Sequence, residues 1–320
     1  MDRRDFLKAT VAAGVAAAAQ GMVKAEPKAT QEEKGKLQKR PLGQTGEELS
    51  IIGFGGIVVM NAEPEQARER VREAIEAGVN YFDVAPTYGD AEEKLGPALE
   101  PYRQQVFLAC KTAERTREGA ARELAQSLER LRTDHFDLYQ LHGLSKMEDL
   151  ETALGPGGAL ETFLEAREKG QVRFLGFSAH SVEVALAAME RFPFDTILFP
   201  FNYTLYFQAN FGPQVLARAR DKGMGCLALK ALARQVWPEE ANRAEYPKCW
   251  YQPVTHPKEL ELALRFTLSE PLTAAIPPGD ERLFRQALKV ARDFRPLNEE
   301  ERIAIRVLSE GLTPIMRLAA

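Results

Sequence analysis

The sequence predicts an α/β fold, a (β/α)8 TIM barrel with an N-terminal β-hairpin cap and an extra C-terminal helix. Two observations lead to this prediction. Amphipathic helical patterns alternate with short apolar strand patterns between residues 51 and 292, and there are eight of each. An open doubly wound sheet is the alternative, but the chain lacks the G-x-G-x-x-G turn that is typical of such a sheet.

The expected barrel strands are short apolar runs. They are Ile51–Phe54, Tyr81–Phe82, Val106–Cys110, Phe136–Leu141, Val172–Gly176, Thr196–Phe199, Gly225–Leu229 and Thr273–Ile276. The expected helices carry apolar residues at helical spacing. They are Glu65–Ala77, Ala91–Leu99, Arg117–Leu131, Ala159–Lys169, Ser181–Arg191, Pro213–Lys222, Pro257–Leu268 and Glu281–Arg292.

Segments outside this alternation complete the expected fold. Pro and Gly residues between Arg40 and Ser50 separate two short extended pieces, which predicts a hairpin. The amphipathic pattern Glu299–Glu310 predicts a helix that packs outside the barrel. Two connections, His142–Gly158 and Lys230–His256, are longer than the roughly two to six residues usual for such loops. Long loops on a barrel rim usually shape a pocket, so we expect both to do so.

The first 25 residues are predicted to be an export signal, followed by a flexible spacer over residues 26–36 and the barrel domain over residues 37–320. The apolar run Ala9–Ala19 is too short to span a bilayer and fits the hydrophobic region of a signal peptide. The paired Arg3 and Arg4 resemble the twin-arginine signal, although Asp2 replaces the usual Ser or Thr. An Ala-rich amphipathic helix is the alternative.

This resemblance implies a partner and a location. The twin-arginine export machinery carries folded proteins, so we expect a periplasmic or otherwise exported protein with no stable membrane anchor after cleavage. The signal and the spacer are therefore left out of the reasoning about the fold.

Composition limits the remaining classes of function. The chain has 320 residues, 45% hydrophobic and 28% charged, which is enough for the core of one large domain. A formal net charge of −4 with interspersed charges offers no basic face, so nucleic acid is not an expected partner. Cys110, Cys226 and Cys249 lack the spacing of a metal site or a disulfide framework, and no metal site is predicted. Cys110 and Cys226 are expected in the core.

Chemically reactive side chains follow the ends of three successive predicted strands. Asp83 and Tyr88 follow the second strand, Lys111 the third and His142 the fourth. Because the ends of successive parallel strands meet at one rim of a barrel, we expect these side chains to lie together where barrel enzymes place their active sites. Each residue alone also has a structural explanation, as a helix cap, a core tyrosine or a solvated surface lysine.

The order Asp, Tyr, Lys and His on these strand ends resembles the catalytic tetrad of the aldo-keto reductases. The stretch Tyr81–Gly89, with Glu92–Gly96 after it, resembles the first signature of that family. Leu108–Thr112 resembles its second motif and Asp137–His142 its third. The resemblance extends from about Leu37 to Ala291. It implies a barrel enzyme that reduces a carbonyl with a nicotinamide cofactor.

The resemblance also implies roles for the four residues. The alkoxide formed by hydride transfer needs a proton, and a phenol with a pKa of about 10 is a poor donor unless a neighbouring ammonium stabilises the phenolate. We therefore expect Tyr88 to be the general acid, Lys111 its activator and Asp83 the partner of Lys111. His142 is expected to hydrogen-bond the carbonyl oxygen.

The implied cofactor lies across the strand ends, and its carboxamide contacts depart from the family pattern. Ser178 matches the Ser of the Gly-x-Ser-Asn segment, but Ala179 replaces the Asn. Leu198 stands where a Gln is usual. Asn202 and His180 are nearby polar residues that either compensate or hydrogen-bond within loops.

Further cofactor contacts are implied toward the phosphates and the adenosine. Lys230 stands where relatives have an aromatic residue or Ser, and its charge is expected to meet either a pyrophosphate or solvent. Arg282 matches a family arginine that suits a 2′-phosphate, and Gln286 stands where an Asn commonly meets adenine. NADPH is therefore favoured, with NADH as the alternative, because Asp280 and Glu281 would repel a phosphate.

Aromatic residues are expected to line the substrate pocket, namely Phe54, Trp237, Trp250 and Tyr251. Such a pocket suits an apolar or aromatic aldehyde or ketone. Alternatively, these side chains pack the long loop onto the barrel. The sequence therefore predicts a reductase of small carbonyl compounds. A nucleotide-bound sensor or binding protein on the same barrel is the alternative, favoured by the lost carboxamide contacts and disfavoured by the complete tetrad.

Overall fold

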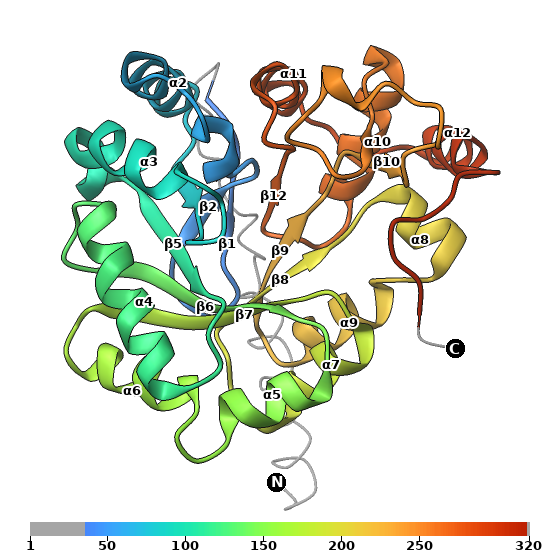
Figure 1. Ribbon diagram of the computed structural model, residues 1–320. Coiled ribbons are helices and arrows are strands. Elements are labelled where there is room, and N and C mark those ends of the chain that lie inside the picture. Colours follow the sequence, from blue (N-terminus) through green and yellow to red (C-terminus); the bar gives the residue numbers. More distant parts are fainter. Residues whose placement is uncertain (1–35, 319–320) are drawn as a thin grey trace, which may run out of the picture. The chain divides into compact units, whose positions relative to one another are not determined.

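Eight parallel strands form one sheet that curls into a nearly closed barrel (Figure 1). The computed structural model describes residues 36–318, so the predicted signal and all but the last residue of the spacer lie outside the described residues. In sheet order the strands are β12 (Ala274–Ile276), β9 (Gly225–Leu229), β8 (Thr196–Pro200), β7 (Val172–Ala179), β6 (Phe136–Leu144), β5 (Phe107–Thr112), β4 (Tyr81–Asp83) and β3 (Phe54–Gly55).

Helices surround the strands on the outside of the barrel (Figure 1). The α-helices are α2 (Pro64–Glu76), α3 (Ala91–Leu99), α4 (Arg117–Arg130), α5 (Met147–Leu154), α6 (Ala159–Glu168), α7 (Val182–Arg191), α8 (Tyr203–Ala209), α9 (Pro213–Asp221), α10 (Pro257–Ser269), α11 (Glu281–Arg292) and α12 (Glu299–Ser309). The 3-10 helices are η1 (Gly56–Val59), η2 (Glu100–Gln105) and η3 (Arg243–Glu245). The (β/α)8 prediction is confirmed. Within the described residues no helix is long and apolar enough to cross a bilayer.

The barrel interior is filled by every second strand residue, and a hairpin closes its N-terminal end. Strands β1 (Lys39–Pro41) and β2 (Glu48–Ser50) pair antiparallel, as predicted. The fully buried Leu42 and Leu49 of the hairpin pack with interior residues of the barrel, such as Tyr81, Phe107 and Leu138. Side chains alternate along a strand, so the inward-facing residues that come later in each strand lie toward the C-terminal end of the barrel.

The barrel closes between β3 and β12, where the ladder is short. Ile52 forms an isolated parallel bridge with Ala275, outside the named strands. The Gly53 amide donates to the Ala275 carbonyl at 3.0 Å, and the Ala275 amide donates to the Ile51 carbonyl at 2.9 Å. The first strand was expected at residues 51–54. The extended segment is there, but only residues 54–55 form a regular ladder with β4.

The two long connections contain structure that was not predicted. After His142, strand β6 continues to Leu144 and helix α5 follows, burying Leu150 and Ala153. After Lys230, strands β10 (Ala233–Gln235) and β11 (Gln252–Pro253) form a small antiparallel sheet. These elements are short, and their apolar residues are too few to produce a clear periodic pattern.

Candidate active site

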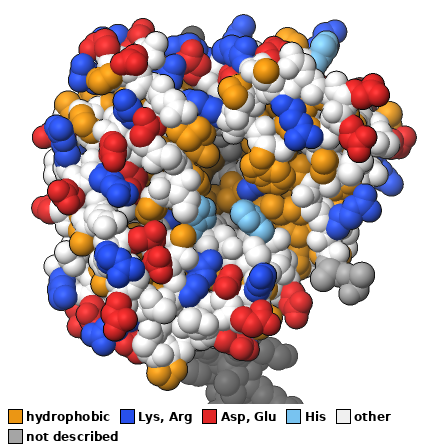
Figure 2. All heavy atoms as spheres, in the orientation of Figure 1, with side chains coloured by type: hydrophobic (Ala, Val, Ile, Leu, Met, Phe, Trp, Pro, Cys, Tyr) orange, Lys and Arg blue, Asp and Glu red, His pale blue; other side chains and the backbone are white. Residues whose placement is uncertain are grey.

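A cavity of about 270 Å³ opens at the C-terminal ends of the barrel strands. Figure 2 shows the hollow on this face, with hydrophobic side chains on its walls and histidine side chains at its rim. All four members of the predicted tetrad line it: Asp83, Tyr88, Lys111 and His142. The structure therefore brings these four side chains together around one cavity.

Asp83 and Lys111 form an ion pair inside the barrel. In the register of β4 and β5, Asp83 lies opposite Ala109. Lys111 comes two residues after Ala109 on β5, so its side chain also points into the barrel, one step closer to the C-terminal end. Lys111 is fully buried, and its Nζ contacts Asp83 Oδ1 and donates to the Val84 carbonyl at 3.1 Å. Burial is the largest single influence and lowers the pKa of Lys111, but the charge and hydrogen bond of Asp83 together with the nearby Tyr88 raise it more, so the net direction is upward. Lys111 therefore stays charged.

Two further donors hold the other oxygen of the Asp83 carboxylate. The Tyr81 hydroxyl and the Gln140 amide nitrogen each donate to Asp83 Oδ2 at 3.2 Å. Tyr81, Asp83 and Gln140 are all buried. With Lys111 on its first oxygen, the carboxylate is held from both sides, which keeps a charged group stable in the interior.

Tyr88 lies in the loop between β4 and α3, next to Lys111. The Nζ of Lys111 is 5.1 Å from the centroid of the Tyr88 ring, and the Tyr88 ring meets the His142 ring edge-on with centroids 5.6 Å apart. Burial raises the pKa of Tyr88, while the charge on Lys111 lowers it, and the net direction is upward. The expected effect of Lys111 is present but smaller than that of burial, so the phenol holds its proton at neutral pH.

His142 is held as a neutral imidazole. Burial, followed by the positive charge of Lys111, lowers the pKa of His142 to about 3. Its Nδ1 is 3.3 Å from the Thr87 hydroxyl, and its backbone carbonyl accepts from Arg115 at 2.7 Å. These contacts fix both the ring and the backbone of His142 beside Tyr88.

A second group of residues lines the cavity next to the tetrad. Lys230 has a left-handed backbone with φ of 62°, and its Nζ is 3.2 Å from His180 Nε2 and 5.6 Å from the Trp250 ring centroid. Ser178 Oγ accepts from the Gly143 amide at 2.7 Å. Lys230, His180, Ser178, Trp250 and Tyr251 all border the cavity.

Three of the predicted cofactor residues lie elsewhere. Asn202 caps α8 by accepting from the Leu205 amide at 2.9 Å and donates to the Lys230 carbonyl at 3.1 Å, so its side chain is used within the protein. Arg282 is ion-paired with Asp280, the N-cap of α11. Gln286 lies in a separate groove bordered by α10 and α11.

Two of the predicted pocket residues also lie outside the cavity, which corrects the sequence prediction. Phe54 pairs with Phe82 across β3 and β4, so both side chains point away from the barrel axis, and Phe54 packs 5.1 Å from Phe284 of α11. Trp237 is buried, and its Nε1 donates to the Cys249 carbonyl at 2.9 Å. Trp237 therefore packs the loop onto the protein.

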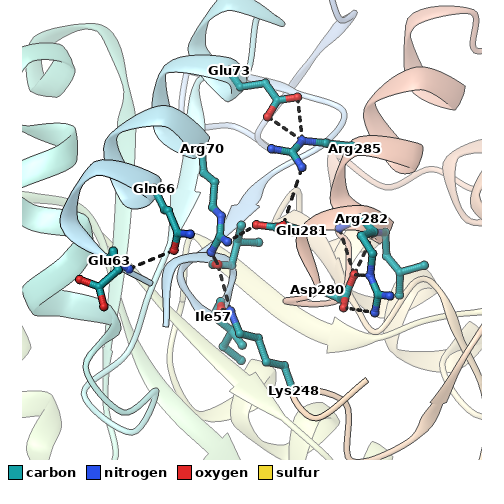
Figure 3. A network of polar contacts seen from close by, with 12 residues as sticks. Ile57, Glu63, Gln66, Arg70, Glu73, Lys248, Asp280, Glu281, Arg282 and Arg285 are labelled. Atoms are coloured by element: carbon teal, nitrogen blue, oxygen red, sulfur yellow. Dashed lines mark hydrogen bonds and ion pairs between the residues drawn. The ribbon is translucent and has the colours of Figure 1, made fainter. Parts of the chain in front are cut away.

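Lys248 is a cavity residue that sequence reasoning missed. It reaches from the segment between β10 and β11 and donates to the Ile57 and Val58 carbonyls of η1 at 3.0 and 3.1 Å (Figure 3). Beside it, Arg70 of α2 pairs with Glu281 of α11 (Figure 3). Nothing distinguishes Lys248 from a solvated loop lysine in the sequence, because its partners are backbone carbonyls far away in the chain.

A model of the aldo/keto reductase family matches residues 51–301. The chain belongs to the aldo/keto reductase family. This aldo/keto reductase is 26% identical over 298 residues to the uncharacterized oxidoreductase YqkF of Bacillus subtilis, covering 83% of this chain and 94% of that protein. It is 31% identical over 217 residues to the aldo-keto reductase YhdN of the same organism, covering 62% of this chain and 63% of that protein.

A solved structure supports the same fold. The holo form of the aldo-keto reductase AKR11C1 from Bacillus halodurans superposes with a TM-score of 0.67 at 23% identity, covering 87% of this chain and 98% of that one. As a member of the family, this aldo/keto reductase is an NAD(P)H-dependent oxidoreductase.

The cavity walls fit the reacting end of a nicotinamide cofactor. Ser178 is almost fully buried, and among residues 36–318 no acceptor receives its hydroxyl proton, so this proton is available to a carboxamide oxygen. Leu198, Leu229 and Ile276 offer an apolar wall for a flat ring. Leu198 provides no amide where the family usually has one, so the fit rests on Ser178 and the apolar wall.

Proposed function

We propose that the protein reduces a small aldehyde or ketone to an alcohol, with Tyr88 as the general acid. The observation that carries this proposal is the buried Lys111, paired with Asp83 and 5.1 Å from the Tyr88 ring. A bound NAD(P)H supplies the hydride. The protein residues orient the carbonyl and provide the proton.

The four side chains divide this work by their charge. Tyr88 keeps its proton until the carbonyl oxygen becomes an alkoxide, and the charge of Lys111 then stabilises the phenolate that remains. Asp83 keeps Lys111 charged and fixed in position. If the Thr87 hydroxyl donates to Nδ1 of the neutral His142, the proton of the ring lies on Nε2, which can then donate to the carbonyl oxygen.

The substitution Tyr88→Phe tests the role of the phenol. We expect kcat to fall on the order of 10²–10⁴-fold, the usual contribution of general acid catalysis, with nearly unchanged cofactor affinity. Tyr102→Phe is a matched control, because Tyr102 belongs to η2 and does not border the cavity. A Tyr88→Phe variant that retains activity within about threefold of the parent would rule out this assignment.

A nucleotide-bound sensor is the second candidate, and the apolar Leu198 at the cavity wall favours it. If the protein is a sensor, reduced nicotinamide bound to the purified protein should not be oxidised by any aldehyde of a broad panel. If it is a reductase, the absorbance of the reduced nicotinamide should decay. We propose NADPH as the preferred cofactor, supported by the half-exposed Arg282 at the start of α11.

We also propose that the protein is exported in folded form by the twin-arginine route. Arg3, Arg4 and the following apolar run support this proposal, and folding before export would let the barrel carry its cofactor. Replacing both arginines by lysine should leave an active protein in the cytoplasm. Fractionation that finds the unaltered chain in the cytoplasm with residues 1–19 attached would contradict export.

A further inference from the structure

Lys230 and His180 form a polar pair that the proton transfer to the carbonyl does not use. Lys230 follows β9 and His180 follows β7, so the two residues come from different strand ends. On the cavity wall Lys230 Nζ lies 3.2 Å from His180 Nε2, and the same nitrogen lies over the Trp250 ring, 5.6 Å from its centroid. The Asn202 side chain holds the Lys230 carbonyl, which fixes the left-handed backbone at this position.

Lys230 has no anionic partner in the described part of the chain. Among residues 36–318, each of the other lysines bordering the cavity has oxygen partners: Lys111 pairs with Asp83, and Lys248 donates to two carbonyls. The partner of Lys230 is an imidazole, and burial lowers the pKa of His180 to about 3, so this ring is a neutral acceptor. Lys230 is partly buried. Holding an ammonium partly out of water without a negative partner is costly, unless a ligand supplies the negative charge.

Lys230 and His180 border the same cavity as Lys111 and His142, which places them beside the reacting groups. The charge on Lys111 contributes to lowering the pKa of Lys230, and both Lys230 and His180 contribute to lowering the pKa of His142. In a nicotinamide dinucleotide a ribose separates the ring from the phosphates. Lys230 shares the cavity with His142 and Lys111, so it is better placed to bind a group attached to the carbonyl compound than a phosphate of the cofactor.

We propose that Lys230, supported by His180, binds an oxyanion on the substrate, so that the preferred substrates are aldehydes or ketones with a carboxylate. This inference rests on the proposed reductase function and names its substrate class. Trp250 is 59% exposed and borders the cavity, so an aromatic or extended substrate can pass it while its carboxylate reaches Lys230. A pyrophosphate of the cofactor has the same oxyanion chemistry and is the competing source.

Protonation gives this subsite a pH dependence. Burial, followed by the charge of Lys111, lowers the pKa of Lys230 to about 7. The titratable groups around it are His180 after β7, Lys111 on β5 and His142 on β6, and the two histidines are neutral above pH 5. A bound anion favours the ammonium form. Affinity for the anion should therefore be high below pH 7 and fall as the pH rises above it.

Substrate selection tests the proposal with Lys230→Met, which removes the charge and keeps the length of the side chain. For 4-carboxybenzaldehyde we expect kcat/KM to fall by about 10- to 100-fold, as for a lost hydrogen bond to a charged group. For 4-methylbenzaldehyde it should change less than about twofold. Lys248→Met removes a charge from the same cavity and should leave the ratio of the two kcat/KM values unchanged. Lys230→Arg keeps a cation and should retain part of the preference.

A binding measurement separates this proposal from the proposed reductase function. Benzoate, which cannot be reduced, should alter the fluorescence of Trp250 at pH 6 more than at pH 8.5, and benzamide should not. The benzoate response should disappear in Lys230→Met and in Trp250→Phe. This response is expected even if no aldehyde is ever reduced, in which case only the reductase function fails.

Two outcomes would overturn the oxyanion subsite. Lys230→Met could weaken NADPH and NADH binding equally while leaving the aldehyde preference intact, which would assign the lysine to a phosphate of the cofactor. Alternatively, benzoate binding and the aldehyde preference could both survive in a Lys230→Met variant with a circular dichroism spectrum like that of the parent. In that case Lys230 binds no anion.

Discussion

The buried ion pair of Lys111 and Asp83 makes a strong prediction about stability. Lys111→Met keeps the volume of the side chain but leaves Asp83 with only two donors, Tyr81 and Gln140. The carboxylate is 3% exposed, so water cannot replace the lost ammonium. Breaking a buried pair in this way costs about 3–5 kcal/mol. For a domain of this size the midpoint of thermal unfolding should fall by roughly 5–15 °C.

A double variant tests whether the unpaired charge causes this loss. Asp83→Asn combined with Lys111→Met removes both charges, so it should recover at least about half of the lost stability. It should not recover activity, because Tyr88 still lacks its ammonium neighbour. Thermal and urea unfolding measure the first effect, and aldehyde reduction measures the second. The reasoning is refuted if Lys111→Met is as stable as the parent or if the double variant is less stable than the single one.

Three further predictions concern pH and the cofactor. Because the pKa of His142 is about 3, the pH–rate profile should show no acid limb near the ordinary histidine value of about 6.5, and such a limb would contradict a neutral His142. Arg282→Ala should weaken NADPH binding by at most about fivefold, since an exposed guanidinium shared with Asp280 contributes little; equal loss for NADH would show that the arginine is structural. Arg265 holds the pKa of Glu301 below its usual value, so this contribution to stability is present above about pH 4.3 and is lost as the pH falls below it. Glu301→Gln should therefore lower the unfolding temperature more at pH 7 than at pH 3, and equal losses at both values would contradict this linkage.

The positions of the four tetrad residues could be predicted from the sequence because these residues are tied to strand ends. Once Tyr81, Phe107 and Leu138 are assigned to parallel strands, alternation along the chain places the later inward residues at one rim. The positions of Asp83 and Lys111 depend only on this alternation. For the same reason the barrel and the hairpin were predictable, since they depend on patterns that extend over many residues.

The residues that were misplaced depend on contacts between distant parts of the chain. Phe54 faces outward because of its register with Phe82, and that register cannot be read from either strand alone. The Trp237 side chain donates a hydrogen bond to the Cys249 carbonyl within the long loop, which holds it away from the cavity. Asn202 caps a short helix that has too few residues for a clear pattern.

The short ladder between β3 and β12 also bears on the motions of the barrel. Backbone amides at this junction, such as Gly53 and Ala275, depend on few neighbouring hydrogen bonds, so local opening should expose them to exchange with solvent sooner than the amides of β6 and β7. The ion pairs Arg70–Glu281 and Arg285–Glu73 hold α2 to α11 on the outside of the same junction (Figure 3). Gly55 of β3 and Ile276 of β12 lie on the two strands of this junction, and both border the cavity. A molecule bound in the cavity contacts both β3 and β12. Its binding should therefore slow deuterium uptake by the backbone amides of this junction, although none of the four tetrad side chains lies on either strand.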